Sequence, residues 1–168
     1  MPSKDGKDNS GQQEFRRIFE EYKKLVYSVA YSFMKNSQDA NDVMQDVFFK
    51  LYECIDELTG DDAYRKWLIS VTANTCKNYL RSSWRSKVFS LEEAKEVSCE
   101  ADLGEESDLF TAVMRLPEKE RVLIHLYYYE GCNVKEISDI LKINESTVRV
   151  RIMRGREKLK KLLKEESV

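Results

Sequence analysis

Residues 133–164 read NVKEISDILKINESTVRVRIMRGREKLKKLLK, and this stretch decides the fold of the C-terminal part of the chain. An amphipathic segment over 133–141 is followed by a tight connection at 142–145 and a long basic segment over 146–164. A short helix, a turn of about four residues and a basic helix make a helix-turn-helix unit. Five apolar residues are expected to form its hinge: Ile137, Ile140, Leu141, Ile143 and Val148.

The basic segment carries eight Lys and Arg residues against the single acid Glu157. An α-helix fits the major groove of DNA, and Arg is the commonest bidentate partner of guanine. Ser146 and Thr147 are expected to cap this helix and to direct backbone N–H groups at phosphate. The pattern favours DNA binding over the two other uses of a basic helix, which are packing against protein and binding of RNA.

Upstream of this unit, apolar residues recur at steps of three and four, which predicts amphipathic helices over 14–34, 38–57 and about 63–84. Three such helices can close one small core. The periodicity returns from residue 109 and includes a helix over 118–129 that starts behind Pro117. The sequence therefore predicts an all-α chain with two small helical domains.

Charge divides the chain more sharply than its net value of −2 indicates. Residues 1–62 carry −5, residues 63–87 carry +6 without a single acid, residues 88–108 carry −7 and residues 109–168 carry +4. Two basic blocks around an acidic stretch indicate two polyanion-binding surfaces and a linker. Four parts are expected: a flexible N-terminus at 1–13, a helical domain at 14–85, a flexible acidic linker at 86–108 and the helix-turn-helix domain at 109–168. By its charge, the linker is expected to weaken DNA binding by the free protein.

Composition excludes several classes of protein. No apolar run in the 168 residues approaches the roughly 20 that a membrane helix needs, and the polar start is not a secretory signal. A cytoplasmic location is expected. The four cysteines form no CxxC pair and the chain has one histidine, so neither a metal site nor a catalytic constellation is expected. We expect no enzyme activity, no cofactor and no small-molecule substrate.

Two parts of the chain resemble one family. The stretch LPEKERVLIHLYYYEGCNVKEISDILKINESTVRVRIMRGREKL resembles the C-terminal DNA-binding domain of extracytoplasmic-function (ECF) sigma factors. DANDVMQDVFFKLY, followed by WLISVTANTCKNYLRSSWR, resembles their N-terminal domain. The resemblance implies an alternative sigma factor, which is a dissociable subunit that directs bacterial core RNA polymerase to promoters and supports their melting.

The resemblance also implies roles for residues of the N-terminal domain. The second helix of the family binds the clamp helices of the largest polymerase subunit, and the matching positions are Asp39, Asp42, Gln45, Asp46 and Glu53. The third helix binds the −10 element of the promoter, and the matching positions are Asn74, Lys77, Asn78, Arg81 and Arg85. The chain departs from the family at Ala73, where Arg is usual, and at Asn78, where Asp is usual. Trp67 and Tyr79 are expected in the core, whereas Trp84 fits stacking on a base as well as it fits packing.

In the C-terminal domain the resemblance assigns the −35 element to Ser146, Thr147, Arg149, Val150, Arg151, Met153 and Arg154. Val150 and Met153 would offer methyl groups to thymine if exposed and would be core residues if buried, and the sequence leaves both open. Arg156 and the basic residues up to Lys164 are expected to bind phosphate or to remain solvated.

Family members are commonly inhibited by an anti-sigma factor, so such a partner is expected beside core polymerase and promoter DNA. The alternative is an autonomous helix-turn-helix regulator. A regulator would explain the basic C-terminal helix, but it would need neither the acidic stripe at 39–53 nor the second basic segment at 63–85.

Overall fold

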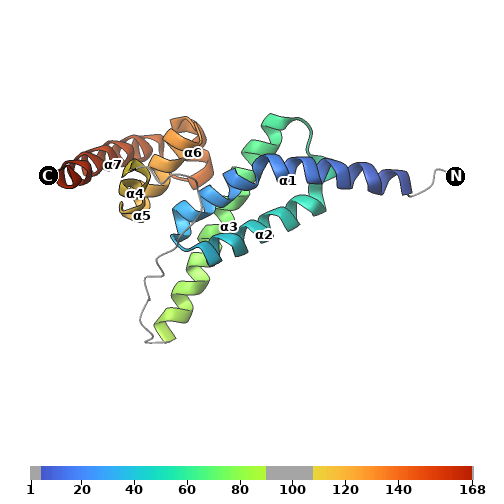
Figure 1. Cartoon of the computed structure of the whole chain (residues 1–168), viewed down its shortest axis with the longest axis horizontal. Coiled ribbons are helices and arrows are strands. Elements are labelled where there is room, and N and C mark those ends of the chain that lie inside the picture. Colours follow the sequence, from blue (N-terminus) through green and yellow to red (C-terminus); the bar gives the residue numbers. More distant parts are fainter. Residues whose placement is uncertain (1–4, 90–107, 168) are drawn as a thin grey trace.

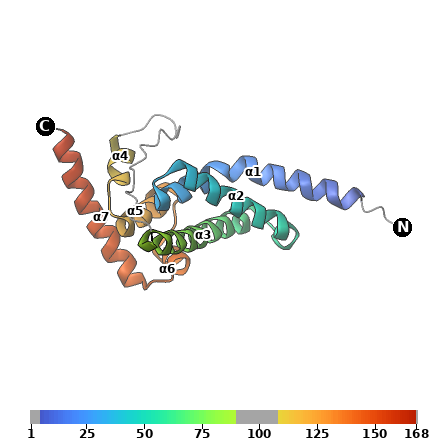
Figure 2. The same cartoon turned by 90° about the horizontal axis from the view of Figure 1, so that it is seen from below.

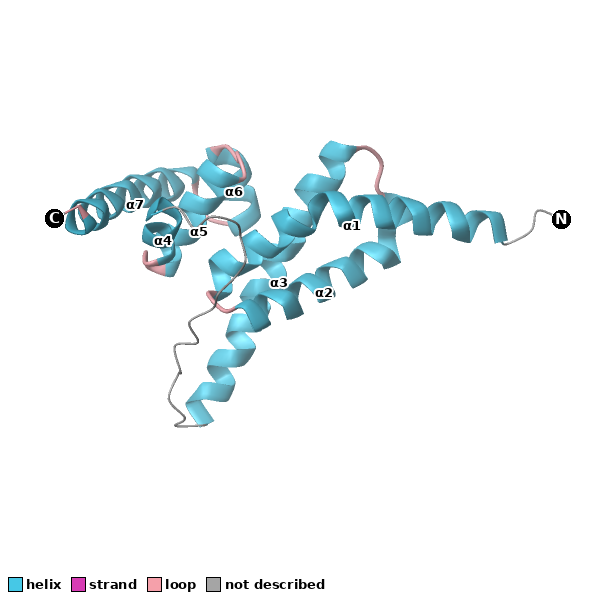
Figure 3. Cartoon of the chain, viewed as in Figure 1, coloured by secondary structure: helices cyan, strands magenta, loops and turns pink. Residues whose placement is uncertain are grey.

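The computed structural model describes residues 5–89 and 108–167, and all regular structure in these two ranges is helical (Figure 1, Figure 3). The predicted all-α fold is confirmed. The first unit contains α1 (Asp5–Met34), α2 (Ser37–Cys54), a 3₁₀ turn η1 (Ile55–Glu57) and α3 (Asp61–Phe89). The second unit contains α4 (Asp108–Met114), α5 (Glu118–Ile124), a π-helical turn η2 (His125–Tyr129), α6 (Val134–Leu141) and α7 (Glu145–Glu166). Most of the acidic linker, and with it the predicted weakening of DNA binding, lies outside the described residues.

The first unit is built on the predicted apolar faces. Ile18, Val26 and Val29 of α1 are fully buried, and α1 packs along both α2 and α3. At the outer end of the unit, aromatic rings continue this core in edge-to-face contact, with 4.8 Å between the ring centroids of Phe19 and Phe48. Helix α1 begins at Asp5, nine residues before the apolar periodicity, because a helix that is already nucleated extends into polar residues at little cost.

The junction between α1 and α2 is closed by a side-chain cap. Lys35 adopts a left-handed conformation with φ of 52°, which ends α1. Ser37 has a hydroxyl that could cap a helix, but α2 already includes that residue. The preceding residue, Asn36, is extended, and its side chain accepts a hydrogen bond of 3.0 Å from the Asp39 backbone N–H. A side chain can cap a helix only from the last non-helical position, which here is Asn36.

The second unit contains the predicted helix-turn-helix in α6 and α7. Asn133 and Glu136 form a reciprocal capping box at the start of α6, and Lys142 ends that helix in the left-handed conformation. Of the five predicted hinge residues, Ile137 and Val148 are fully buried, and the other three are half-buried against the core. The helix expected over 118–129 is divided, because its last five residues form the wider turn η2.

The two units pack against each other, with α1 against α5 and η2, and α3 against α6. Both views show the second unit at the end of α1 that is opposite the N-terminus (Figure 1, Figure 2). The Tyr31 ring of α1 stacks on the Phe110 ring of α4, with 6.5 Å between their centroids. The first and second units thus share one continuous apolar core in the described ranges.

Candidate nucleic-acid and partner interfaces

One face of α2 is acidic and exposed, while the opposite face is buried. Asp42, Gln45, Asp46 and Glu53 are exposed to solvent, and Val43, Val47, Phe48 and Leu51 of the same helix are buried. Asp39 is different, because it is half-buried and its Oδ1 accepts a hydrogen bond of 3.4 Å from the Tyr79 hydroxyl. Burial and the nearby Asp39 carboxylate raise the pKa of Tyr79, so the hydroxyl stays a donor. Four of the five predicted partner-binding positions therefore form one open surface, and Asp39 joins α2 to α3.

Two aromatic residues that the sequence does not single out lie within this acidic surface. The side chain of Phe49 is 65% exposed and that of Tyr52 is 52% exposed. Phe49 follows Asp46 by three residues, which places it on the same helical face. That spacing could have revealed both residues, but aromatic residues in an amphipathic helix are normally assigned to the core. We call the exposed set Asp42, Gln45, Asp46, Phe49, Tyr52 and Glu53 the α2 surface.

The predicted −10 residues of α3 do not share one environment. Asn74, Asn78 and Arg81 are exposed on one face of the helix, at steps of three and four. Lys77 lies between them in sequence, but it is half-buried, and its Nζ donates a hydrogen bond of 3.0 Å to the Leu141 carbonyl at the end of α6. Burial, together with the charges of Lys142 and Arg81, lowers the pKa of Lys77. The side chain of Arg85 lies outside the described set.

The aromatic residues and family departures of α3 have clear positions. Trp67 and Tyr79 are half-buried and pack against the core, as predicted, whereas the Trp84 side chain lies outside the described set. Ala73 is fully buried, so its side chain contributes nothing to the exposed face of α3. Asn78 is exposed, and its amide is open to solvent.

The predicted −35 residues lie along the first three turns of α7. Val150 is 40% exposed and Met153 is 53% exposed, which decides the open question in favour of a surface position. Arg149 and Arg154 are exposed beside them, and Arg149 forms an ion pair of 3.1 Å with Glu145 one turn earlier. The other members of the predicted set are the exposed Ser146 and the half-buried Thr147 and Arg151.

The start of α7 lies earlier than predicted. The helix begins at Glu145, so Ser146 and Thr147 are inside its first turn and do not cap it. Asn144 occupies the N-cap position, and within the described residues its side chain makes no capping hydrogen bond. The N–H groups in the first turn of this 22-residue helix therefore remain available as hydrogen-bond donors. They also lie at the positive end of the helix dipole.

Two cations further along α7 are engaged within their own unit. Arg156 lies over the rings of Tyr127 and Tyr128 and donates a hydrogen bond to the Tyr128 hydroxyl. Lys158 pairs with the largely buried Glu120 of α5 at 2.7 Å. Both side chains remain exposed to solvent, in line with the expectation that they bind phosphate or stay solvated, and both also stabilise the contact of α7 with α5 and η2.

The described ranges offer no candidate for a metal site or a membrane span. They contain no cluster of three or more His, Cys, Asp or Glu residues that could hold a metal ion. None of their helices is long and apolar enough to cross a membrane. Cys54, Cys76 and Cys132 are free thiols.

The described residues thus expose a basic face on α7, a polar and basic face on α3 and an acidic face on α2. Comparison with known proteins identifies the class. Residues 18–86 match the Sigma-70 region 2 family and residues 107–159 match the Sigma-70 region 4 family. The ECF RNA polymerase sigma-E factor of Escherichia coli K12 is 33% identical over 162 residues, which cover 87% of this chain and 84% of the relative. The ECF sigma factor SigW of Bacillus subtilis is 27% identical over 92% of this chain and 91% of its own.

Solved structures show the same fold. The sigma factor RpoE of Bartonella quintana, solved with the anti-sigma factor NepR, superposes with a TM-score of 0.69 and 21% identity over 91% of this chain and 96% of that chain. CnrH, solved with the cytosolic domain of CnrY, superposes with a TM-score of 0.61 and 22% identity over 92% and 90%. The chain belongs to the ECF sigma factor family, whose members are transcription-initiation proteins. The family predicted from the sequence is confirmed.

Proposed function

We propose that this chain is an alternative sigma factor that docks on core RNA polymerase through the α2 surface and recognises a two-part promoter through α3 and α7. The observation that carries the proposal is that one chain exposes both the α2 surface and the predicted −35 face of α7. A regulator that acts alone would use the recognition helix but has no need of an acidic, aromatic-centred face on a second unit.

The α2 surface suits a partner with basic and apolar side chains. Its three exposed carboxylates, Asp42, Asp46 and Glu53, surround Phe49 at helical spacing. In protein interfaces, aromatic residues are common hot spots, and charged residues commonly form the rim around them. In this proposal Phe49 provides apolar contact area with the partner. The carboxylates orient the partner on the α2 surface and increase the rate of association.

Promoter recognition is assigned to two faces. On α7, Arg149 and Arg154 would contact base edges or phosphates of the −35 element, while Val150 and Met153 would contact thymine methyl groups. The first-turn N–H groups of α7 would receive a backbone phosphate. On α3, Asn74 would contact a base of the −10 element, and the cations of the same face would follow the strand. We assign the −10 role, together with polymerase docking, to a domain at 14–85 and the −35 role to a domain at 109–168, joined by the segment 86–108.

The direct test is in vitro transcription with purified bacterial core polymerase on a pool of genomic fragments. The native chain should produce new start sites, and a variant with Asp42→Ala, Gln45→Ala and Asp46→Ala should lose them. A matched control removes the same two negative charges elsewhere, by Glu20→Ala on α1 and Glu165→Ala on α7, both exposed acids. The control should keep every start site.

The regulator alternative predicts a different result in the same assay. It would show specific duplex binding by the chain alone, and no start site would depend on the chain.

We also propose that the protein acts in the cytoplasm and is controlled by an anti-sigma factor, by analogy with RpoE of Bartonella quintana, which was solved with one. Such an inhibitor, added to the transcription assay, should remove the new start sites.

A further inference from the structure

Three large apolar side chains are exposed on the second unit and have no part in the proposed function. They are Leu109 of α4 and Tyr128 and Tyr129 of η2. The other exposed large apolar residues of the described ranges belong to the α2 surface or to the predicted −35 face of α7. Leu109, Tyr128 and Tyr129 all line one groove, which also includes residues of α7. Exposed apolar residues that gather around a groove mark a candidate binding site.

The interior of this groove is apolar and large enough for a small molecule. Val113 of α4, Ile124 of α5 and Leu159 of α7 line it and are buried, and Leu163 is half-buried. Helix α4 lies beside α7 (Figure 2). The groove has a volume of about 520 Å³. Sites for small ligands commonly measure about 300–1,000 Å³ and are lined mainly by apolar side chains.

The charge on the groove is positive. Among the described residues that line it, Arg156 and Lys160 of α7 are the charged ones, and both are exposed. They lie four residues apart, so their side chains are neighbours on one face of the helix. Like charges at this spacing repel each other, and an anion between them relieves the repulsion. The groove therefore combines an apolar interior with a position for one anionic group.

Arg156 is already oriented for such a contact. Its guanidinium lies over the rings of Tyr127 and Tyr128, and its Nε donates a hydrogen bond to the Tyr128 hydroxyl. Its two terminal nitrogens make no hydrogen bond to a described residue, which leaves their N–H groups for a ligand. A guanidinium can bind one carboxylate through two parallel hydrogen bonds. Because the tyrosine rings already order this side chain, less entropy is lost when a ligand binds.

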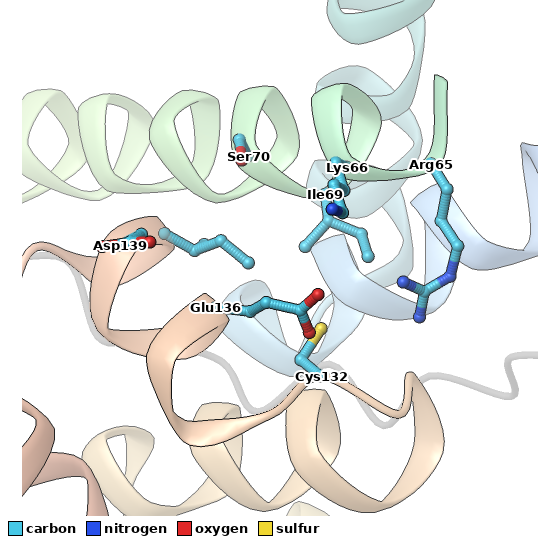
Figure 4. A pocket seen from close by; sticks show the side chains of 8 residues that line it. Arg65, Lys66, Ile69, Ser70, Cys132, Glu136 and Asp139 are labelled. Atoms are coloured by element: carbon cyan, nitrogen blue, oxygen red, sulfur yellow. The ribbon is translucent and has the colours of Figure 1, made fainter. Parts of the chain in front are cut away.

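A second pocket in the described ranges shows the contrast. This pocket, of about 180 Å³, lies between α3 and α6 (Figure 4). Its cations Arg65 and Lys66 come from α3, and its acids Glu136 and Asp139 come from α6. Two positive and two negative side chains balance within that pocket, so it has no net attraction for a charged ligand. The groove on the second unit is larger and has no such balance among its described lining residues.

We propose that the groove between α4, η2 and α7 binds a long-chain amphiphile with one anionic head group, of which a free fatty acid is the simplest form. The carboxylate lies between Arg156 and Lys160, and the acyl chain packs on the apolar interior. Nine described residues line the groove, whereas a stable protein interface uses about 20–30 residues on each side. A small amphiphile therefore fits better than an acidic helix of a partner protein. This site goes beyond the proposed function, because its residues belong neither to the α2 surface nor to the predicted DNA-binding faces.

The first test is calorimetric titration of the full chain with dodecanoate below its micelle concentration. One dodecanoate should bind per chain. Octanoate should bind at least about tenfold more weakly, because each buried methylene group contributes a factor of about four. Dodecanol, which has no charge, should also bind at least about tenfold more weakly, since it loses the hydrogen bonds to a charged group. Dodecyltrimethylammonium should bind more weakly still, and equal binding of all three twelve-carbon compounds would overturn the role of the two cations.

Variants at exposed positions test the site without disturbing the core. Leu109→Asp brings a carboxylate to the groove and should weaken dodecanoate binding at least about tenfold. Its matched control is Thr111→Asp, the same charge on an exposed position of α4 outside the lining. Lys160→Gln should weaken binding about fivefold, as the loss of an exposed ion pair. Its control is Lys161→Gln, on the next exposed residue. Both controls should bind as the native chain does, and unchanged helicity by circular dichroism separates lost binding from unfolding.

Crosslinking locates the ligand. Dodecanoate with a photoreactive diazirine at the end of its chain should label peptides that contain α4 or residues 156–163, as identified by mass spectrometry. The proposal is overturned if dodecanoate shows no saturable binding, if Leu109→Asp and Lys160→Gln bind it like the native chain, or if the labels lie outside the groove. An acidic helical peptide that labels the groove, where dodecanoate does not bind, would instead assign it to a protein partner. None of these measurements needs polymerase or DNA, so their outcome is independent of the proposed function.

Discussion

Gly155 of α7 lies directly against Ile124 and Glu120 of α5. A Cβ at this position would lie 2.8 Å from Cγ1 of Ile124, 3.0 Å from its Cδ1 and 3.4 Å from Cβ of Glu120. The shortest of these contacts is not found between real carbon atoms, so a side chain here would push α7 away from α5. Since α7 carries the predicted −35 face, the absence of a side chain at Gly155 allows this helix to pack closely on α5.

We therefore expect Gly155→Ala to destabilise the second unit. Overpacking costs about 1–3 kcal/mol, and the gain in helix propensity of about 1 kcal/mol offsets only part of it. Urea denaturation should show the loss, and Ile124→Val, which shortens the opposing side chain, should recover some of it. Gly11→Ala is the control, because a Cβ added there on α1 would meet no described atom within 4 Å. That change should be neutral or stabilising, and equal losses at both glycines would contradict the argument.

The buried thiol of Cys76 should lower the free energy of unfolding at alkaline pH. Burial raises the pKa of its thiol from 9.0 to about 12, with a smaller effect from the Glu118 carboxylate. Between these values the unfolded chain loses a proton that the folded chain keeps. The thiol's contribution to stability is thus complete below pH 9 and is lost as the pH rises toward 12, by at most about 1.4 kcal/mol per pH unit. Denaturation at a series of pH values should show a shallower fall for Cys76→Ala than for the native chain.

Among the helices, α6 and α7 differ in how their first turns are satisfied. Asn133 caps α6 through a hydrogen bond of 2.8 Å from the Glu136 N–H, and the Glu136 side chain accepts one of 2.9 Å from the Asn133 N–H. Asn144 holds the corresponding position before α7, where no side-chain cap bond forms within the described residues. We expect Asn133→Ala to cost about 1 kcal/mol of unfolding free energy. Asn144→Ala should cost clearly less, and urea denaturation that ranks the two in reverse order would contradict the assignment.

The two faces of α2 allow stability and partner binding to be tested separately, because one face packs in the core and the other is exposed. Phe48 is buried, whereas its neighbour Phe49 is exposed. Phe49→Ser should change the denaturation midpoint little and should weaken binding to core polymerase by about tenfold, the loss of an interface hot spot. Phe48→Ser should unfold the first unit. Fluorescence titration against core polymerase, together with urea denaturation, distinguishes the two effects. A Phe49→Ser chain that binds polymerase normally would remove the aromatic residue from the α2 surface.

At the scale of the whole molecule, Arg121 should make the two units unfold together. The buried guanidinium of this α5 residue donates hydrogen bonds to the Ser32 and Phe33 carbonyls in the last turn of α1. Removing its guanidinium leaves the carbonyls of Ser32 and Phe33 buried without this donor, at about 1–3 kcal/mol for each unsatisfied group. We expect one cooperative thermal transition for the native chain and two resolved transitions for Arg121→Met. Calorimetry provides the measurement. The exposed Arg154 of α7, changed in the same way, is the control, and a single transition in both variants would show that Arg121 does not couple the units.

Most of the helices and both units were predictable from the sequence, because apolar residues that face a core must recur at the helical period. The contact between the units was not. Arg121 and Lys77 bind main-chain carbonyls, which every residue carries, so no side-chain pattern marks their partners. Likewise, the exposed carboxylates of α2 were predictable from their spacing. Phe49 and Tyr52 share that spacing but were missed, because an aromatic residue beside an apolar face is normally counted as core.

The capping of α1 by Arg121 also has a consequence for synthesis of the chain on the ribosome. The Ser32 carbonyl is made 89 residues before the arginine that binds it. At about 5–20 residues per second, the Ser32 carbonyl exists for roughly 4–18 s before Arg121 is polymerised. During that interval the end of α1 must be hydrated or bound by another molecule. A nascent chain that is stalled before residue 121 should therefore expose this end to proteases, and the completed protein should protect it.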